Sequence, residues 1–275
     1  MGVPGLSLHV RDLGSGPPVV FLHPGPGLDG SVFLPGAERL AETHRVLLVD
    51  LPGNGRSPDG DRNEWSLAGF GRAVEQLAGE LDLRDWTLLG HSFGGFVAMQ
   101  HLVDFPSGAA RRIASCTDAS ETPPPGEPED LLADLTPEQR ERLEEGEARE
   151  QVASSPQQLK DAWLEQAPRL TVSEAALMRM LRDVLFRPEM GRPRDWGELE
   201  ALTALAFTEV PVLAIGAELD RAIPPEAARR IAITAPEGEL LMLEGCGHFP
   251  FAEAPDRYWP AVESWLLRTA VGTGA

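Results

Sequence analysis

Gly90-His91-Ser92-Phe93-Gly94-Gly95 fits the pattern G-x-S-x-G and lies between an apolar segment, 86–89, and a helical pattern, 94–103. The pattern predicts a sharp strand-to-helix turn in a strained conformation, in which the glycines let strand and helix approach closely. Such a turn projects the Ser92 hydroxyl above the sheet and places the Phe93 N–H at a helix N-terminus, where negative charge is stabilised. We therefore predict that Ser92 is a nucleophile; the plain alternative is a serine that caps an ordinary helix.

The segments on either side of this turn alternate between short apolar runs and amphipathic helices. This alternation is typical of an α/β fold with a mostly parallel, doubly wound sheet and helices on both faces. We expect strands at 6–10, 19–22, 45–50, 86–89, 112–116, 210–215 and 240–243, and helices at 67–81, 94–103, 225–235 and 256–268.

The composition changes after the fifth of these strands. Residues 122–128 are rich in proline, and helix-start signatures follow at Thr136, Ser155 and Thr171 with no strand between them. We therefore predict that residues 1–118 and 208–275 form the α/β core and that 119–207 is an all-helical lid.

A second glycine- and proline-rich segment, His23-Pro24-Gly25-Pro26-Gly27, ends the strand at 19–22. An oxyanion hole needs a backbone N–H at this place, and within 24–26 only Gly25 has one because proline lacks it. We predict that the N–H groups of Gly25 and Phe93 form the hole and that the Gly25–Pro26 peptide is a candidate for the cis form. The alternative is a tight turn without a role in binding.

Ser92 requires a base with a pKa near neutrality, and histidine is the usual one; the chain has six histidines. Only His248 lies in a glycine-rich loop after a predicted strand, where sites form in open parallel sheets. His9, His44 and His101 are expected at the surface or in the core, His91 is expected to point away from Ser92, and His23 is expected to buttress its own loop. Asp220, after the strand at 210–215, is the predicted acid because acid then histidine follow the serine in this chain order; Asp118 is the alternative.

Charge and composition limit the partners. The net charge of −19 and pI of about 4.7 argue against nucleic acid and anionic membranes as partners, so we expect a small-molecule substrate. The two cysteines are interpreted as free, reduced thiols in a cytoplasmic protein. We expect no signal peptide and no membrane-spanning segment, and the oligomeric state is open.

Together with the Asp50–Ser57 segment, these elements resemble the α/β-hydrolase family, and within it proline iminopeptidases and related esterases. The resemblance implies an eight-stranded sheet with a helical lid after the sixth strand, so our count is one strand short. Asp50–Ser57 is usually a structural turn in that family. The chain departs from the peptidases at Pro24, where they have glycine, and at Phe93, where they commonly have tryptophan.

The lid supplies weaker candidates for substrate binding. Ala162-Trp163-Leu164-Glu165 faintly resembles the peptidases' Trp-x-x-Trp-Glu segment, whose glutamates bind a free amine; the alternative for Glu165 is a solvated helix residue. Met178, Met180, Leu181 and Leu185 could line an apolar acyl or alcohol pocket, although lid–core packing is the favoured explanation for most of them.

The expected activity is hydrolysis of an ester, lactone or amide through an acyl-enzyme at Ser92, with no cofactor and no metal. A carboxylesterase is favoured, and an aminopeptidase of the proline iminopeptidase type is the alternative. Haloperoxidases, C–C bond hydrolases and hydroxynitrile lyases also retain the serine, and an inert binding module remains open.

Overall fold

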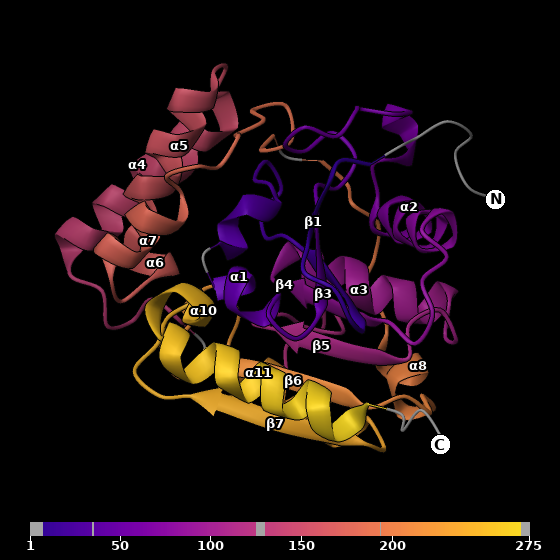
Figure 1. Ribbon diagram of the computed structural model, residues 1–275. Coiled ribbons are helices and arrows are strands. Elements are labelled where there is room, and N and C mark those ends of the chain that lie inside the picture. Colours follow the sequence, from indigo (N-terminus) through magenta and orange to yellow (C-terminus); the bar gives the residue numbers. More distant parts are fainter. Residues whose placement is uncertain (1–7, 35, 125–129, 193, 271–275) are drawn as a thin grey trace, which may run out of the picture.

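A seven-stranded sheet forms the centre of the molecule in a computed structural model that describes residues 8–34, 36–124, 130–192 and 194–270 (Figure 1). The strand order is β1-β3-β2-β4-β5-β6-β7; β1 is antiparallel to β3 and all other neighbours are parallel. The strands are β1 Val10–Leu13, β2 Pro18–Leu22, β3 Arg45–Val49, β4 Thr87–His91, β5 Arg111–Ser115, β6 Val212–Ala217 and β7 Gly238–Leu243. The predicted α/β class and doubly wound sheet are confirmed.

The first strand differs from the prediction. Residues 6 and 7 lie outside the described part of the chain, and the ladder with β3 begins at Val10, which is paired with Val49. His9 instead binds the turn after β3, since its carbonyl accepts the Asp50 N–H at 3.0 Å. Pairing with β3 therefore decided the register, not the local alternation of residues 6–10.

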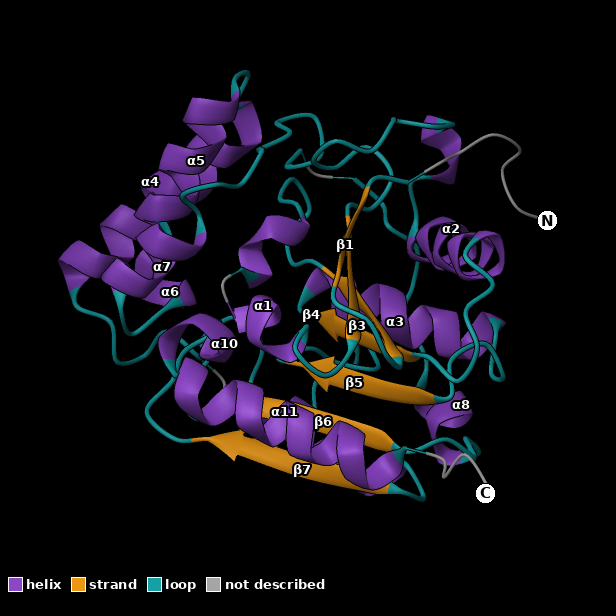
Figure 2. Cartoon of the chain, in the orientation of Figure 1, coloured by secondary structure: helices purple, strands orange, loops and turns teal. Residues whose placement is uncertain are grey.

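Helices cover both faces of the sheet (Figure 2). Alternation along β2 sends Val20 and Leu22 into the cluster under α2 and α3, and Val19 and Phe21 into the cluster under α1 and α11. The covering helices are α1 Gly36–Leu40, α2 Leu67–Glu80, α3 Phe93–Asp104, α9 Pro225–Thr234, α10 Pro250–Glu253 and α11 Pro255–Thr269, with short 3-10 turns η1 Gly30–Phe33 and η2 Arg62–Glu64. No helix within the described ranges is both long and apolar enough to span a bilayer.

Between β5 and β6 the chain forms α4 Pro137–Val152, α5 Pro156–Glu165, α6 Ala167–Leu170, α7 Glu174–Met180 and α8 Leu202–Ala206. α4 begins with the predicted capping box of Thr136 and Gln139, and Ser155 and Ser173 cap α5 and α7. Helices α4 to α7 stand away from the sheet, whereas α8 packs beside α3 and α9 (Figure 1). We propose that 119–207 is an insertion in which α4 to α7 form the lid and the segment from Trp196 onward is held by the core, since Trp196 O accepts the Leu67 N–H.

The helix that the sequence predicts from Thr171 onward is shorter than its apolar pattern suggested. α7 ends at Met180, with Leu181 as its C-cap, so residues 184 and 185 do not continue its apolar face. Leu185 is instead drawn to the core, because its N–H donates to the buried Asp29 carboxylate at 3.0 Å.

Candidate active site

Ser92 occupies the turn between β4 and α3 in a conformation that L-residues rarely adopt, with φ 52° and ψ −119°. The neighbouring glycines are needed for space: a Cβ on Gly90 would lie 2.3 Å from the Gly94 carbonyl oxygen, and one on Gly95 would lie 2.4 Å from Thr117. Thr117 Oγ1 also donates to the Ser92 carbonyl at 2.9 Å. The turn thus has the tight geometry expected from the sequence, and Ser92 remains partly exposed.

The three side chains nominated from sequence form one hydrogen-bonded line. Ser92 Oγ lies 2.9 Å from His248 Nε2, and His248 Nδ1 lies 2.8 Å from Asp220 Oδ2. Asp220 Oδ1 accepts the N–H groups of Ala222 and Ile223 at 2.8 and 3.0 Å. Because an ionised carboxylate only accepts, Nδ1 carries the imidazole proton and Nε2 is left to accept from the Ser92 hydroxyl.

Asp118, the alternative acid, lies at the end of the neighbouring strand but has a different partner. Its Oδ1 forms an ion pair with Arg230 Nη2 and accepts the Ala119 N–H at 2.7 Å. The structure therefore brings Asp220 to His248 and holds Asp118 in an ion pair with the core.

The loop at residues 23–27 follows β2 and therefore lies at the same edge of the sheet as Ser92, because β2 and β4 are parallel neighbours. Gly25 has φ 118°, a value that favours glycine, and the Gly25–Pro26 peptide is cis, as predicted. Within the described residues, neither the Gly25 nor the Phe93 N–H has a hydrogen-bond acceptor. Both groups are thus available to an external oxyanion.

Buried polar contacts hold this loop in place. His23 Nε2 accepts the Leu51 N–H at 3.1 Å and Nδ1 lies 2.7 Å from the Pro24 carbonyl, so Nδ1 is the donor of a neutral ring. Burial lowers the pKa of His23, in agreement with that neutral form. Asn54 Oδ1 accepts the Gly27 N–H at 2.7 Å, and Asp50 accepts the N–H groups of Gly30 and Arg56. The Asp50–Ser57 segment is therefore a structural turn that supports the loop.

Two buried residues beside His248 were not anticipated. The His91 ring lies beside His248: its centroid is 5.1 Å from that of His248, and its Nδ1 is 3.0 Å from Ser115 Oγ. Burial lowers the pKa of His91 well below its usual value. Three other histidines contact other residues: His9 lies beside Asp50, His44 beside Thr43, and His101 beside Glu75.

The second is Cys116, which has φ 42° directly after β5. Sγ of Cys116, a carboxylate oxygen of Asp220 and a ring nitrogen of His248 lie within 4.8 Å of one another. Burial, and then the Asp220 charge, raise the thiol pKa well above its usual value, and the Asp220 oxygens already have donors. A protonated thiol beside an occupied carboxylate is a poor metal-ligand set. No sequence signal indicated either neighbour, because both depend on which strands lie side by side.

The six lid residues nominated for substrate binding do not form a common wall. Met180, Leu181 and Trp163 are buried, whereas Met178 and Leu185 are 54 % and 39 % exposed. The Glu165 carboxylate lies 3.2 Å from Arg142 and 3.4 Å from Arg149, so it is already paired within the lid. The apolar stripe was a poor guide because α7 ends before its last members.

Other lid residues meet the site instead. Leu159 packs over Gly27, where a Cβ would lie 3.1 Å from Leu159 Cδ2, and the Arg187 N–H donates to the Gly27 carbonyl at 2.9 Å. The His248 N–H donates to the Leu170 carbonyl at 3.1 Å. The lid is thus bonded both to the Gly25 loop and to the His248 loop.

Comparison with known proteins places this geometry in a family. The sequence model of the alpha/beta hydrolase family matches residues 19–261, which is most of the chain. The chain belongs to the alpha/beta hydrolase family. This hydrolase is 29 % identical over 269 residues to a pimeloyl-[acyl-carrier protein] methyl ester esterase of Xanthomonas campestris, covering 94 % of this chain and 98 % of that protein.

Solved structures share the fold of this alpha/beta hydrolase. A thermophilic esterase from Thermogutta terrifontis superposes with a TM-score of 0.77 at 23 % identity, covering 98 % of this chain and 97 % of that one. A proline iminopeptidase from Mycobacterium smegmatis superposes with a TM-score of 0.74 at 20 % identity, covering 99 % and 98 %. The likeness therefore extends over the lid as well as the core.

Proposed function

We propose that this alpha/beta hydrolase is a serine carboxylesterase that cleaves small esters through an acyl-enzyme at Ser92. The observation that carries the proposal is the line Ser92 Oγ, His248 Nε2, His248 Nδ1, Asp220 Oδ2, with contacts of 2.9 and 2.8 Å, beside two N–H groups without acceptors. A base within hydrogen-bond reach of the hydroxyl, itself oriented by a carboxylate, is the arrangement that activates a serine.

In the first half-reaction, Ser92 Oγ bonds to the ester carbonyl carbon as His248 Nε2 takes its proton. The carbonyl oxygen becomes an oxyanion that accepts the Gly25 and Phe93 N–H groups. The carbon–oxygen bond to the alcohol then breaks, and the His248 proton leaves with the alcohol. Asp220 stays ionised and stabilises the imidazolium in between.

In the second half-reaction, water attacks the acyl-Ser92 carbonyl and His248 takes its proton. The same two N–H groups hold the second oxyanion, and the proton returns to Ser92 as the carboxylic acid leaves. The two half-reactions use the side chains of Ser92, His248 and Asp220, the N–H groups of Gly25 and Phe93, and one water molecule.

The lid favours esters over amino-terminal prolyl amides as substrates. An aminopeptidase needs an acceptor for the substrate's free amine, and Glu165, the residue nominated for that role, is paired with Arg142 and Arg149. The name of the Xanthomonas relative also refers to an ester. An apolar side chain, Leu159, lies over the Gly25 loop, which suits an uncharged acyl or alcohol group.

The test is labelling with a fluorophosphonate, followed by hydrolysis of p-nitrophenyl acetate and butyrate beside proline β-naphthylamide. We expect labelling at Ser92, turnover of the short esters and little turnover of the amide. Ser92→Ala should abolish labelling and lower kcat by about 10⁴-fold or more. Ser107→Ala, in an exposed turn after α3, is the matched control and should behave as the parent.

Intact labelling after Ser92→Ala would overturn the assignment of the nucleophile. Preference for the prolyl amide over both esters would overturn the esterase proposal while leaving the nucleophile in place.

A further inference from the structure

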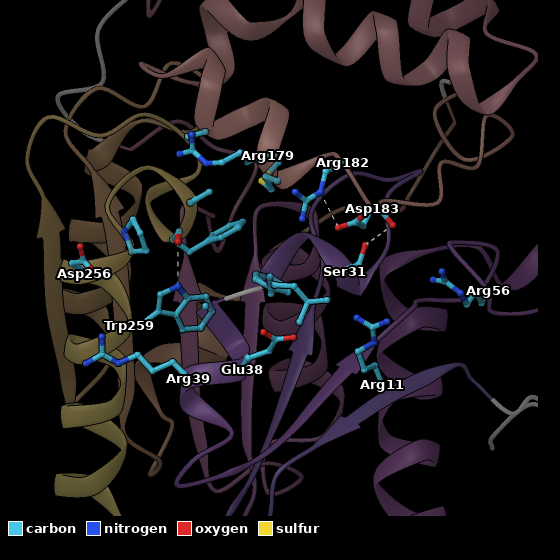
Figure 3. Close-up of a pocket in the computed structure, with 18 residues that line it drawn as sticks. Arg11, Ser31, Glu38, Arg39, Arg56, Arg179, Arg182, Asp183, Asp256 and Trp259 are labelled. Atoms are coloured by element: carbon cyan, nitrogen blue, oxygen red, sulfur yellow. Dashed lines mark hydrogen bonds and ion pairs between the residues drawn. The ribbon is translucent and has the colours of Figure 1, made fainter.

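A large cleft lies apart from Ser92, between the lid and the core. It has a volume of about 990 Å³ and is lined by residues of α7 on one side and of η1, α1 and α11 on the other (Figure 3). Ser92, Asp220 and His248 do not line this cleft, and neither do Gly25 and Phe93. The cleft is therefore a separate feature, which the mechanism above leaves without a role.

Arginine gathers in this cleft although the chain as a whole is strongly acidic, with a net charge of −19. Figure 3 shows arginines above the cleft on the lid and below it on the core. The five that line it are Arg11, Arg39, Arg56, Arg179 and Arg182, and the acidic residues that line it are Glu38, Asp183 and Asp256.

Ion pairing leaves an excess of positive charge. Arg56 is paired with Asp29 and Arg182 with Asp183, each at 3.2 Å. Among the described residues, the other three arginines have no carboxylate within ion-pair distance, while most arginines elsewhere in the chain do. Only Glu38 and Asp256 oppose those three. An unpaired guanidinium offers donors that suit phosphate or carboxylate.

The floor of the cleft is apolar. The apolar surface that a ligand can reach belongs to Leu34, Ala252 and Pro255, which line the cleft and are partly or fully exposed. Phe33, Met180, Phe251 and Trp259 also line it but are almost fully buried, and the indole N–H of Trp259 already donates to the Phe251 carbonyl at 3.1 Å. A bare inorganic anion would leave this floor unused.

We propose that the cleft is a binding site for a small amphipathic anion, in which an alkyl or aromatic body covers Leu34 and Ala252 and a phosphate or carboxylate head is bound by Arg39 and Arg179. The two arginines belong to different parts of the molecule, Arg179 to lid helix α7 and Arg39 to core helix α1. A ligand that binds both holds the lid against the core, so its binding raises the temperature of unfolding. The site is independent of the proposed esterase activity.

The experiment is calorimetric titration of the full chain after its Ser92 has been blocked with a fluorophosphonate. Three probes separate head from body: octyl phosphate carries both, inorganic phosphate lacks the body, and octyl glucoside lacks the charge. Octanoate, with the same body type and a carboxylate, distinguishes the two anionic heads. We expect octyl phosphate to bind at least about tenfold more tightly than inorganic phosphate or octyl glucoside, with an affinity that falls as salt is added.

The variants locate the site. Arg39→Gln combined with Arg179→Gln should weaken octyl phosphate binding about tenfold or more and remove its effect on the unfolding temperature. Arg229→Gln is the matched control, since Arg229 is an exposed arginine of α9 without an ion pair among the described residues. Should the double variant unfold, the single charge reversal Arg39→Glu gives a second test of octyl phosphate binding. Arg39 is exposed, so this single change should leave the fold intact.

Equal affinity of octyl phosphate for the parent and for both arginine variants would overturn the site. Loss of octyl phosphate binding on blocking Ser92 would overturn it too, because the ligand would then occupy the esterase site. Sedimentation of the protein with phosphatidylglycerol vesicles would overturn the assignment to a free ligand; we expect the protein to stay in the supernatant.

Discussion

The loops at the carboxyl edge of the sheet and the lid helices α4 and α5 are both rich in polar groups but hold them in different ways. At the sheet edge, His23, Asp220 and His248 are at most 3 % exposed, and their polar atoms have defined partners in the structure. On the lid, Arg149 and Glu145 form an ion pair in which each side chain is 54 % exposed. Polar groups at the edge are buried and directional, whereas an exposed ion pair such as this one on the lid is solvated and exchangeable.

This contrast determines what a single substitution should do. A buried polar group that loses its partner keeps its desolvation cost, whereas an exposed ion pair contributes about 0–1 kcal/mol. We therefore expect changes at the edge to affect chemistry strongly and changes on α4 and α5 to affect it little.

After Ser92→Ala, the largest effect is expected for Asp220→Asn. The amide oxygen would accept the Ala222 and Ile223 N–H groups, as Asp220 Oδ1 does, so the amide NH2 would face His248 Nδ1 as a donor. The ring then loses its tautomer and its stabilisation as imidazolium, and kcat should fall about 10³- to 10⁴-fold. The measurement is kcat for p-nitrophenyl acetate. Asp118→Asn is the control, because Asp118 is bound to Arg230 and should keep kcat within about threefold. Equal losses in the two variants would break the comparison between the carboxylates.

Gly25→Ala is expected to have the next largest effect. A Cβ there would lie 3.1 Å from the Gly27 nitrogen and 3.2 Å from the Leu28 nitrogen, at φ 118°. The loop must shift its N–H away from the oxyanion, so kcat should fall about 10- to 100-fold. Gly79→Ala, in an open position of α2, should leave kcat unchanged and stabilise the fold by about 0.5–1 kcal/mol. Unchanged kcat in Gly25→Ala would remove Gly25 from the oxyanion hole.

Stability against acid should also separate the two regions. Burial lowers the pKa values of His23 and His91, so below about pH 6.5 the unfolded chain binds protons that the folded chain refuses. The free energy of unfolding should therefore fall as the pH falls from 7 to 5, by up to about 1.4 kcal/mol per pH unit for each histidine. Urea midpoints at several pH values measure it.

On the lid, burial raises the pKa of Glu150, and its effect on stability has the opposite sign to that of the histidines. The folded chain takes up this proton at a higher pH than the unfolded chain, so Glu150 offsets part of the loss of stability as the pH falls toward 5.

His91→Phe should give a shallower pH dependence of the free energy of unfolding than the parent. The same slope in parent and variant would show that His91 is not buried in its neutral form.

The smallest effect is expected for Glu165→Gln. The carboxylate is paired with two arginines of α4 in a solvated position, so the free energy of unfolding should change by less than about 1 kcal/mol. Ester turnover should stay within about twofold of the parent. A selective loss of prolyl amide hydrolysis would contradict this picture and place a substrate amine at Glu165.

Sequence reasoning worked best where one local pattern set the backbone conformation. The glycines around Ser92 indicated the strained turn, and the prolines of the 23–27 loop left Gly25 as the donor within 24–26. It worked least well in the lid, where an apolar pattern running to Leu185 suggested a longer helix than the one that ends at Met180. There, a contact distant in sequence, from Leu185 to Asp29, competes with local helix propensity.

By itself, the amino-acid sequence determined the alternation of strands and helices and the turn at Ser92, because each depends on residue types within a few positions of one another. It nominated Asp220 and His248 from their places after predicted strands and from their order in the chain. Only the tertiary structure decided that Asp220 rather than Asp118 meets the histidine, that His91 and Cys116 lie beside it, and that arginines of α1 and α7 face one cleft. Such neighbours are separated by up to 156 residues, as Ser92 and His248 are, and the order of strands and the position of the lid bring them together.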